Sequence, residues 1–100
     1  MSYSIMPLYN NTCLIIYQLQ RPGQDYPELI TEIKKLGNHW HVMKSKWIIN
    51  TSLKAVQIRD RLLPYLDKND QMLVVKTNNE AAWTGLSVEG GEWLKRNLNV

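Results

Sequence analysis

A chain of 100 residues, 44% hydrophobic and 21% charged, is long enough for one globular domain and too short for two. Its single cysteine, Cys13, excludes an intramolecular disulfide and a zinc site built on several cysteines. No apolar run approaches the roughly 18 residues of a membrane span, and a net charge of +3 indicates no partner by itself. Without a basic and apolar leader segment, the chain is expected to be cytoplasmic, with no membrane partner.

The start of the chain differs in pattern from the rest. Pro7 and the pair Asn10-Asn11 favour turns, so residues 1–12 are predicted to form an N-terminal arm ahead of a single domain over 13–100. Two interpretations of the arm stay open. Its apolar side chains allow it to dock, for example on a second protomer, and the alternative is a leader without fixed structure.

A strand and a helix follow the arm. The run Cys13–Leu19 is nearly continuous in apolar residues, which indicates a central strand. Asp25 and Glu28 have the spacing of a capping box, and Pro27 is tolerated in a first helical turn. Gly37 fits the stop position of this helix. Apolar residues recur at helical spacing and predict one buried stripe: Tyr26, Leu29, Ile30, Ile33 and Leu36.

The segment His39–Asn50 is typical of two short strands around a tight basic turn at Met43–Ser45. His39 and His41 share one strand face, and Trp40 lies on the other face.

A second helix is predicted after this hairpin, capped by Thr51 or Ser52 and ended by Pro64. Its predicted core stripe is Ala55, Ile58, Leu62 and Leu66. The run Gln71–Thr77 is a further buried strand candidate.

The C-terminal part predicts two short elements. Ala82–Leu86 is interpreted as a fifth strand, and Ser87 as the cap of a helix that runs to about Leu98. Gly90-Gly91 weakens the helix prediction by about 1 kcal/mol per glycine compared with alanine.

The order strand, helix, strand, strand, helix, strand predicts an α+β fold, ferredoxin-like with an antiparallel sheet, plus the short C-terminal strand and helix. Both main helices then cover one sheet face and leave the other for a partner, a tail or a ligand. We expect some of the following residues to line this second face: Tyr17, His39, Trp40, His41 and Trp47. Of these, Tyr17, His39 and His41 are predicted as dimer or sheet-face contacts.

Charge is concentrated in the middle of the chain. The segment Ile33–Leu66 has seven Lys or Arg residues and one acidic residue, a net charge of +6, and the remainder nets −3. These side chains either converge on an anionic partner or form a solvated face. The predicted partner-binding or nucleic-acid-binding residues are Lys44, Lys46, Arg59, Arg61, Trp40 and Trp47, with the tryptophans as anchors.

Other chemistry has weaker support. His39 and His41 have the spacing of a metal pair, and an ordinary surface pair is the alternative. Asp67 and Asp70 have too few companions for a divalent metal site, which favours a hydrated loop. No catalytic residue, metal site or cofactor is predicted.

These patterns carry a resemblance. The chain resembles the CRISPR-associated Cas-two family in the order of its elements. That order is strand, helix, Gly37, the segment Val42–Ile48, helix and strand. A nearer resemblance is to small proteins of bacteria and mobile elements labelled "SinR family", and it covers roughly residues 13–98. The shared segments are Ile16–Leu19, Pro22–Tyr26, Trp47–Ile49, Ile58–Leu62, Glu80–Ser87 and Glu92–Lys95. The resemblance implies a ferredoxin-like domain that dimerises through its sheet face.

One departure from the Cas-two pattern decides the functional hypothesis. The resemblance implies a metal-binding aspartate at the end of the first strand, where this chain has Gln18, and a neutral amide cannot replace a carboxylate pair. The hypothesis is therefore a noncatalytic homodimeric interaction module that binds a protein or nucleoprotein complex, in conflict between mobile elements and host defence. The alternatives are a Cas-two-like metal-dependent nuclease and a nucleic-acid-binding protein that stacks RNA bases on Trp47.

Overall fold

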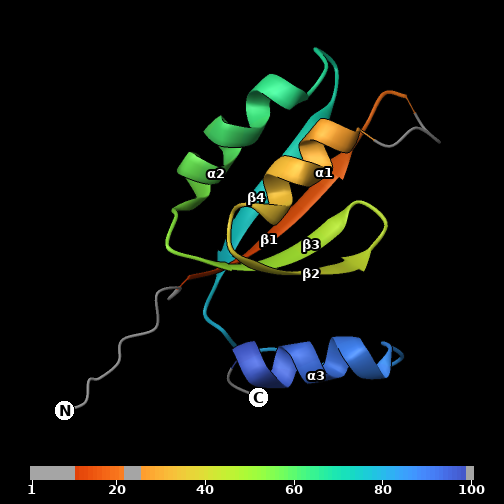
Figure 1. The fold of residues 1–100 in the computed structure, drawn as a ribbon, viewed down its shortest axis with the longest axis vertical. Coiled ribbons are helices and arrows are strands. Elements are labelled where there is room, and N and C mark those ends of the chain that lie inside the picture. The colour runs from red at the N-terminus through yellow and green to blue at the C-terminus, as the bar shows by residue number, and fades with distance from the viewer. Residues whose placement is uncertain (1–10, 22–25, 99–100) are drawn as a thin grey trace.

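A computed structural model describes residues 11–21 and 26–98 and shows an α+β domain (Figure 1). The elements, in chain order, are β1 (Asn11–Gln18), α1 (Pro27–Lys34), β2 (Asn38–Met43), β3 (Lys46–Thr51), α2 (Ala55–Leu62), a 3-10 turn η1 (Leu63–Tyr65), β4 (Gln71–Thr77) and α3 (Val88–Asn97). The predicted mixture of helices with an antiparallel sheet is confirmed. Residues 1–10 of the predicted arm lie outside the described residues, while Asn11 and Thr12 belong to β1.

The four strands form one sheet in the order β2-β3-β1-β4. β1 is antiparallel to both of its neighbours, with Ile15 opposite Trp47 on β3 and opposite Val74 on β4. β2 pairs with β3 through the hairpin. The first strand is therefore central, as its apolar run predicts, and β2 and β4 are the two edges.

The core lies between the sheet and the two helices α1 and α2, which cover the same sheet face (Figure 1). Alternate residues of β1 point into it, because successive strand residues face opposite sides. Each fully buried aliphatic or aromatic side chain contributes about 1.5–3 kcal/mol. The buried cluster is Cys13, Ile15, Tyr17, Tyr26, Leu29, Ile33, Leu36, Trp47, Ile49, Ile58 and Leu62.

The predicted core stripe of α1 is confirmed, but its start differs from the capping-box prediction. Tyr26 occupies the N-cap position without a side-chain cap bond, and Pro27 is the first helical residue. Asp25 lies outside the described residues. Tyr26 contributes to the core instead, with 5% of its surface exposed.

The structure requires a glycine at position 37 for a reason that differs from the predicted role as a helix stop. A Cβ atom at this position would collide with the backbone carbonyl oxygen of Asn50 on β3. The Thr51 hydroxyl donates a 2.8 Å hydrogen bond to the Leu36 carbonyl beside it. The chain leaving α1 thus packs directly against the β3 backbone.

The start of α2 also differs from the sequence prediction. Lys54 is the N-cap, and its backbone N–H donates to the Gln57 side chain at 2.8 Å. Thr51 remains in β3. Pro64 lies in η1 directly after α2, so the predicted end of this helix is confirmed.

The C-terminal helix is confirmed and the fifth strand is wrong. The Ser87 hydroxyl accepts a hydrogen bond from the Gly90 N–H at 3.0 Å and caps α3. Residues 82–86 contain no strand, and Gly85 takes a positive φ of 80° there, which favours a turn. α3 lies beside β2, across the sheet from α1 and α2 (Figure 1).

Two tryptophan rings fix α3 in this place. The Trp40 indole of β2 lies so close to Gly90 that a Cβ there would be 2.7 Å from its Cζ2 atom. The Trp83 indole lies against Gly91 in the same way, with Nε1 3.3 Å from the position of a Cβ. The two glycines, which weaken a helix by propensity, are therefore the packing surface of α3.

Candidate functional site

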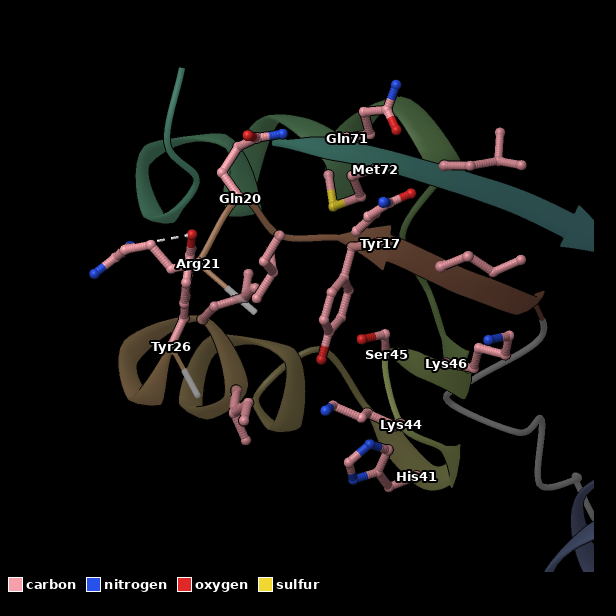
Figure 2. A pocket seen from close by; sticks show the side chains of 16 residues that line it. Tyr17, Gln20, Arg21, Tyr26, His41, Lys44, Ser45, Lys46, Gln71 and Met72 are labelled. Carbon is pink, nitrogen blue, oxygen red and sulfur yellow. Dashed lines mark hydrogen bonds between the residues drawn. The ribbon is translucent and has the colours of Figure 1, made fainter. Parts of the chain in front are cut away.

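A hollow of about 920 Å³ opens where β1 ends, between the β2–β3 turn and α1 (Figure 2). Figure 2 shows the Tyr17 side chain extending from β1 into this hollow, with its hydroxyl directed toward Lys44 and Ser45. Arg21 and Tyr26 lie at the other end. The hollow therefore joins the hairpin turn to the loop that follows β1.

The lining of the hollow is basic. It includes Arg21, Lys44 and Lys46, together with His41, and the described residues that line it include no Asp or Glu. Lys44 and Lys46 are exposed and form no ion pair with any described residue. These two lysines, which have no acidic partner among the described residues, give the hairpin end of the hollow a positive potential that attracts anions.

The hairpin turn is held against the end of β1. Lys44 and Ser45 form the turn, one residue shorter than the predicted Met43–Ser45, and Ser45 takes a positive φ of 64°. The Ser45 carbonyl accepts a hydrogen bond from the Tyr17 N–H at 3.1 Å. The side chain of Lys44 is thus carried by a turn with a fixed place beside Tyr17.

A polar network closes the other end of the hollow. Arg21 Nε donates to Asp67 Oδ2 at 2.9 Å, and its guanidinium lies 4.3 Å from the centre of the Tyr26 ring. The Tyr26 hydroxyl donates to Asp67 at 3.1 Å and lies 3.3 Å from Asp70 Oδ1. The two aspartates predicted to belong to a hydrated loop thus fasten the end of β1 to the α2–β4 loop.

Asp70 carries most of this attachment. Its carboxylate accepts hydrogen bonds from the backbone N–H groups of Gln20 at 2.7 Å and Asp67 at 2.6 Å. Desolvation raises the pKa of the Asp70 carboxyl, but these two bonds, with the Tyr26 hydroxyl and the Arg21 charge, outweigh it and lower the pKa below its usual 3.8. Desolvation also raises the pKa of the Tyr26 phenol, so it stays a hydrogen-bond donor.

The two histidines lie on the helix-covered face of the sheet. His41 stacks on Trp47 at 4.0 Å between ring centres, and His39 meets the same ring edge-on at 5.9 Å. Trp47 Nε1 donates to the Tyr17 hydroxyl at 3.1 Å. The sequence predicts five candidates for the sheet face opposite the helices, and only Trp40 lies on that face.

Tyr17, His39 and His41 therefore lie on the sheet face covered by α1 and α2, and not on the second face where the sequence prediction placed them. Trp47, predicted as a partner anchor, has 1% of its surface exposed and serves the core.

The four predicted basic residues are not brought together. Lys44 and Lys46 lie at the hairpin turn on β2 and β3, whereas Arg59 and Arg61 lie exposed on α2. α2 packs on β4, at the opposite edge of the sheet from the hairpin. Arg59 is also paired with Asp60 at 2.8 Å. The basic segment of the sequence thus splits into two separate surfaces, and one of them lines the hollow.

The sheet face opposite α1 and α2 carries an apolar strip that the sequence prediction did not name. We define the open strip as Leu14, Ile16, Ile48, Leu73 and Val75, which share this face by strand alternation. Leu73 has 56% and Val75 41% of its surface exposed, although both lie in the middle of β4. α3 packs against β2 on this face, so it lies next to the β3 end of the strip, where Trp40 of β2 is paired with Ile48.

A second, smaller hollow lies between α3 and β2. Trp40, Val88 and Trp93 line it together with Glu89, Glu92 and Arg96. Trp93 Nε1 donates to the Asn38 side chain at 3.3 Å. Trp40 Nε1 is buried without a hydrogen-bond partner in the described part of the chain.

The side chains that could serve catalysis or metal binding are scattered among the described residues. These residues contain no group of three or more His, Cys, Asp and Glu side chains placed to hold a metal ion. Cys13 is buried in the core, and desolvation raises the pKa of its thiol. Gln18 is exposed at the end of β1, beside the hollow. No helix among the described residues has the length and apolarity needed to cross a membrane.

Comparisons with known proteins give no relative for this chain. No protein-family model, no curated protein and no solved structure matches it.

Proposed function

We propose that this chain is a noncatalytic interaction module, built on a ferredoxin-like domain, that forms a homodimer through the open strip. The strand order β2-β3-β1-β4, with one helix after β1 and one after β3, supports the ferredoxin-like assignment. The same order of elements supports kinship with the Cas-two-like and "SinR family" proteins. The dimer would bind a protein or nucleoprotein complex, in the setting of conflict between mobile elements and host defence.

The single observation that carries the dimer is the exposure of Leu73 and Val75 in the middle of a strand. An antiparallel sheet with one covered face normally has polar residues on the other face, yet here apolar residues face outward on three adjacent strands. Contiguous exposed apolar surface of this kind marks an interaction site.

A second copy fits the open strip better than a charged partner. None of the strip's own side chains carries a charge, and Lys46, which shares this face opposite Ile16, lies at the end of β3, so two copies related by a two-fold axis can meet over the strip without like-charge repulsion at its centre. The strip also reaches β4, an edge strand that contains no proline. Both features favour an isologous contact between identical chains.

The experiment is sedimentation equilibrium of the full chain, compared with Val75→Lys. A lysine at this position places two charges in the desolvated contact, so the dimer should dissociate at least about tenfold more readily, about 1.4 kcal/mol. Val56→Lys is the matched control, because Val56 is equally apolar and 50% exposed but lies on α2.

A monomeric wild-type chain at millimolar concentration would contradict the proposal. Equal weakening by Val75→Lys and Val56→Lys would also contradict it, because the effect would then not belong to the open strip. A chain lacking residues 1–10 separates the contribution of the N-terminal arm, and it should still dimerise.

A further inference from the structure

We infer that the hollow at the end of β1 binds a phosphate-bearing ligand of nucleotide size. The inference goes beyond the proposed dimer and does not depend on it, because the cavity is formed within one chain.

The charge of the lining points to an anion. Lys44 and Lys46 line the hollow without an acidic partner among the described residues, whereas Arg21, at the other end, is already paired with Asp67. Lys44 extends back from the turn toward the Tyr17 hydroxyl (Figure 2), and no described residue neutralises it. The lysine ammonium is a compact charge suited to a phosphate group.

The size and the apolar wall point to more than an inorganic ion. A volume of about 920 Å³ lies within the range typical of small-molecule pockets. Leu29 and Ile30 of α1, with Met72 of β4, line the hollow beside Tyr17. An apolar wall next to cations suits a planar base attached to a phosphate.

The groups that would meet the ligand are already held in place. Trp47 bonds the Tyr17 hydroxyl, the Tyr17 N–H bonds the carbonyl of the hairpin turn, and Asp67 holds Arg21. Binding to such a site costs little ordering of side chains or backbone, which favours affinity.

The test is a titration of the isotopically labelled full chain with AMP, followed by amide chemical shifts. Adenosine and inorganic phosphate are the controls, and a 5′-phosphorylated tetranucleotide is the second ligand. AMP should shift the amide signals of residues 17–19 and 41–46. It should bind more tightly than either control, and its affinity should fall as the salt concentration is raised. A tetranucleotide that binds more tightly than AMP identifies a strand end as the source of the phosphate, and the reverse order identifies a free nucleotide.

Two variants of equal charge make the test specific to the site. Lys44→Glu should reduce AMP affinity at least about tenfold. Lys95→Glu changes the net charge equally but lies exposed on α3 and should leave affinity within about twofold. The inference is overturned if neither phosphorylated ligand shifts these amides at about 5 mM, or if the two variants weaken binding equally.

Discussion

At the scale of single residues, the structure depends on small side chains where two backbones meet. Gly37 is the clearest case, because its missing Cβ leaves room for the Asn50 carbonyl. The sequence predicts that Gly37 stops the first helix, whereas α1 ends at Lys34 with Lys35 as its C-cap, two residues before the glycine. It could not reveal the contact with Asn50, because that contact joins residues whose proximity depends on the sheet pairing.

Gly37→Ala should therefore destabilise the domain by about 2 kcal/mol or more, since the colliding atom belongs to the backbone and cannot rotate away. Urea unfolding measures the change. Gly85→Ala is the comparison, because Gly85 has open space around it and only its positive φ opposes a side chain. That variant should lose about 1 kcal/mol. A smaller loss for Gly37→Ala than for Gly85→Ala would contradict the packing argument.

Asp70 should make stability depend on pH. Its folded-state pKa is lowered, so its contribution is present above the unfolded pKa, near 3.8, and is lost as pH falls through the folded value. Asp70→Asn should cost about 1 kcal/mol at pH 7, because the group is only partly shielded from solvent, and progressively less below pH of about 4.

Urea unfolding between pH 2 and 7 measures this dependence. Asp60→Asn is the control, because the Asp60 side chain bonds only to that of the adjacent Arg59 among described residues, and it should cost less than half as much at pH 7. A constant difference between wild type and Asp70→Asn over this range would refute the assignment.

At the scale of elements, the sequence predicts the helices and strands well and their faces poorly. The stripe of α1 and the stop at Pro64 follow from local rules, so both are predictable. Which side of β1 meets the helices does not follow, because Leu14 and Ile16 are as apolar as Cys13 and Ile15. The pairing of β1 with β3 and β4 decides whether its odd-numbered or its even-numbered residues face the helices. The predicted roles of Tyr17, His39 and His41 depended on that choice.

α3 gives a prediction in which local and tertiary effects have opposite signs. Helix propensity alone expects Gly90→Ala to stabilise by about 1 kcal/mol. From the structure we expect Gly90→Ala to destabilise the domain, because the new methyl group would lie 2.7 Å from Trp40 Cζ2 and push α3 away from β2. Urea unfolding gives the sign, and amide exchange in α3 locates the effect.

Gly91→Ala is the matched variant in the same helix. The closest atom to its Cβ would be Trp83 Nε1, at 3.3 Å, so a small shift of that ring accommodates it. Its effect should be milder than that of Gly90→Ala. A stabilised Gly90→Ala variant would mean that the indole of Trp40 is not held against α3.

At the scale of the whole molecule, the two sheet faces have different tasks. One face is closed by α1 and α2 and holds the core, while the other carries α3 beside β2 and leaves the open strip half-buried on β1 and exposed on β4. The sequence predicts that a second face needs cover. It places the basic residues in one segment, but folding separates Arg59 and Arg61 from Lys44 and Lys46. The hollow was not predictable, because its lining comes from four separate parts of the chain.

Dimer formation should be visible in the melting temperature. If folding is coupled to association, the melting temperature of the wild type rises with protein concentration, and that of Val75→Lys does not. Calorimetry over about a hundredfold range of concentration measures this. A wild-type melting temperature independent of concentration would count against a dimer at these concentrations.

The central position of β1 also has a consequence for synthesis. β1 is made well before β4, which is one of its two partner strands, and Thr12 pairs with Thr77. Until about residue 77 has left the ribosome, β1 has an unpaired edge and the core is incomplete. The chain therefore cannot fold stepwise from its start, and nascent chains that stop before Gln71 should be captured by chaperones or degraded.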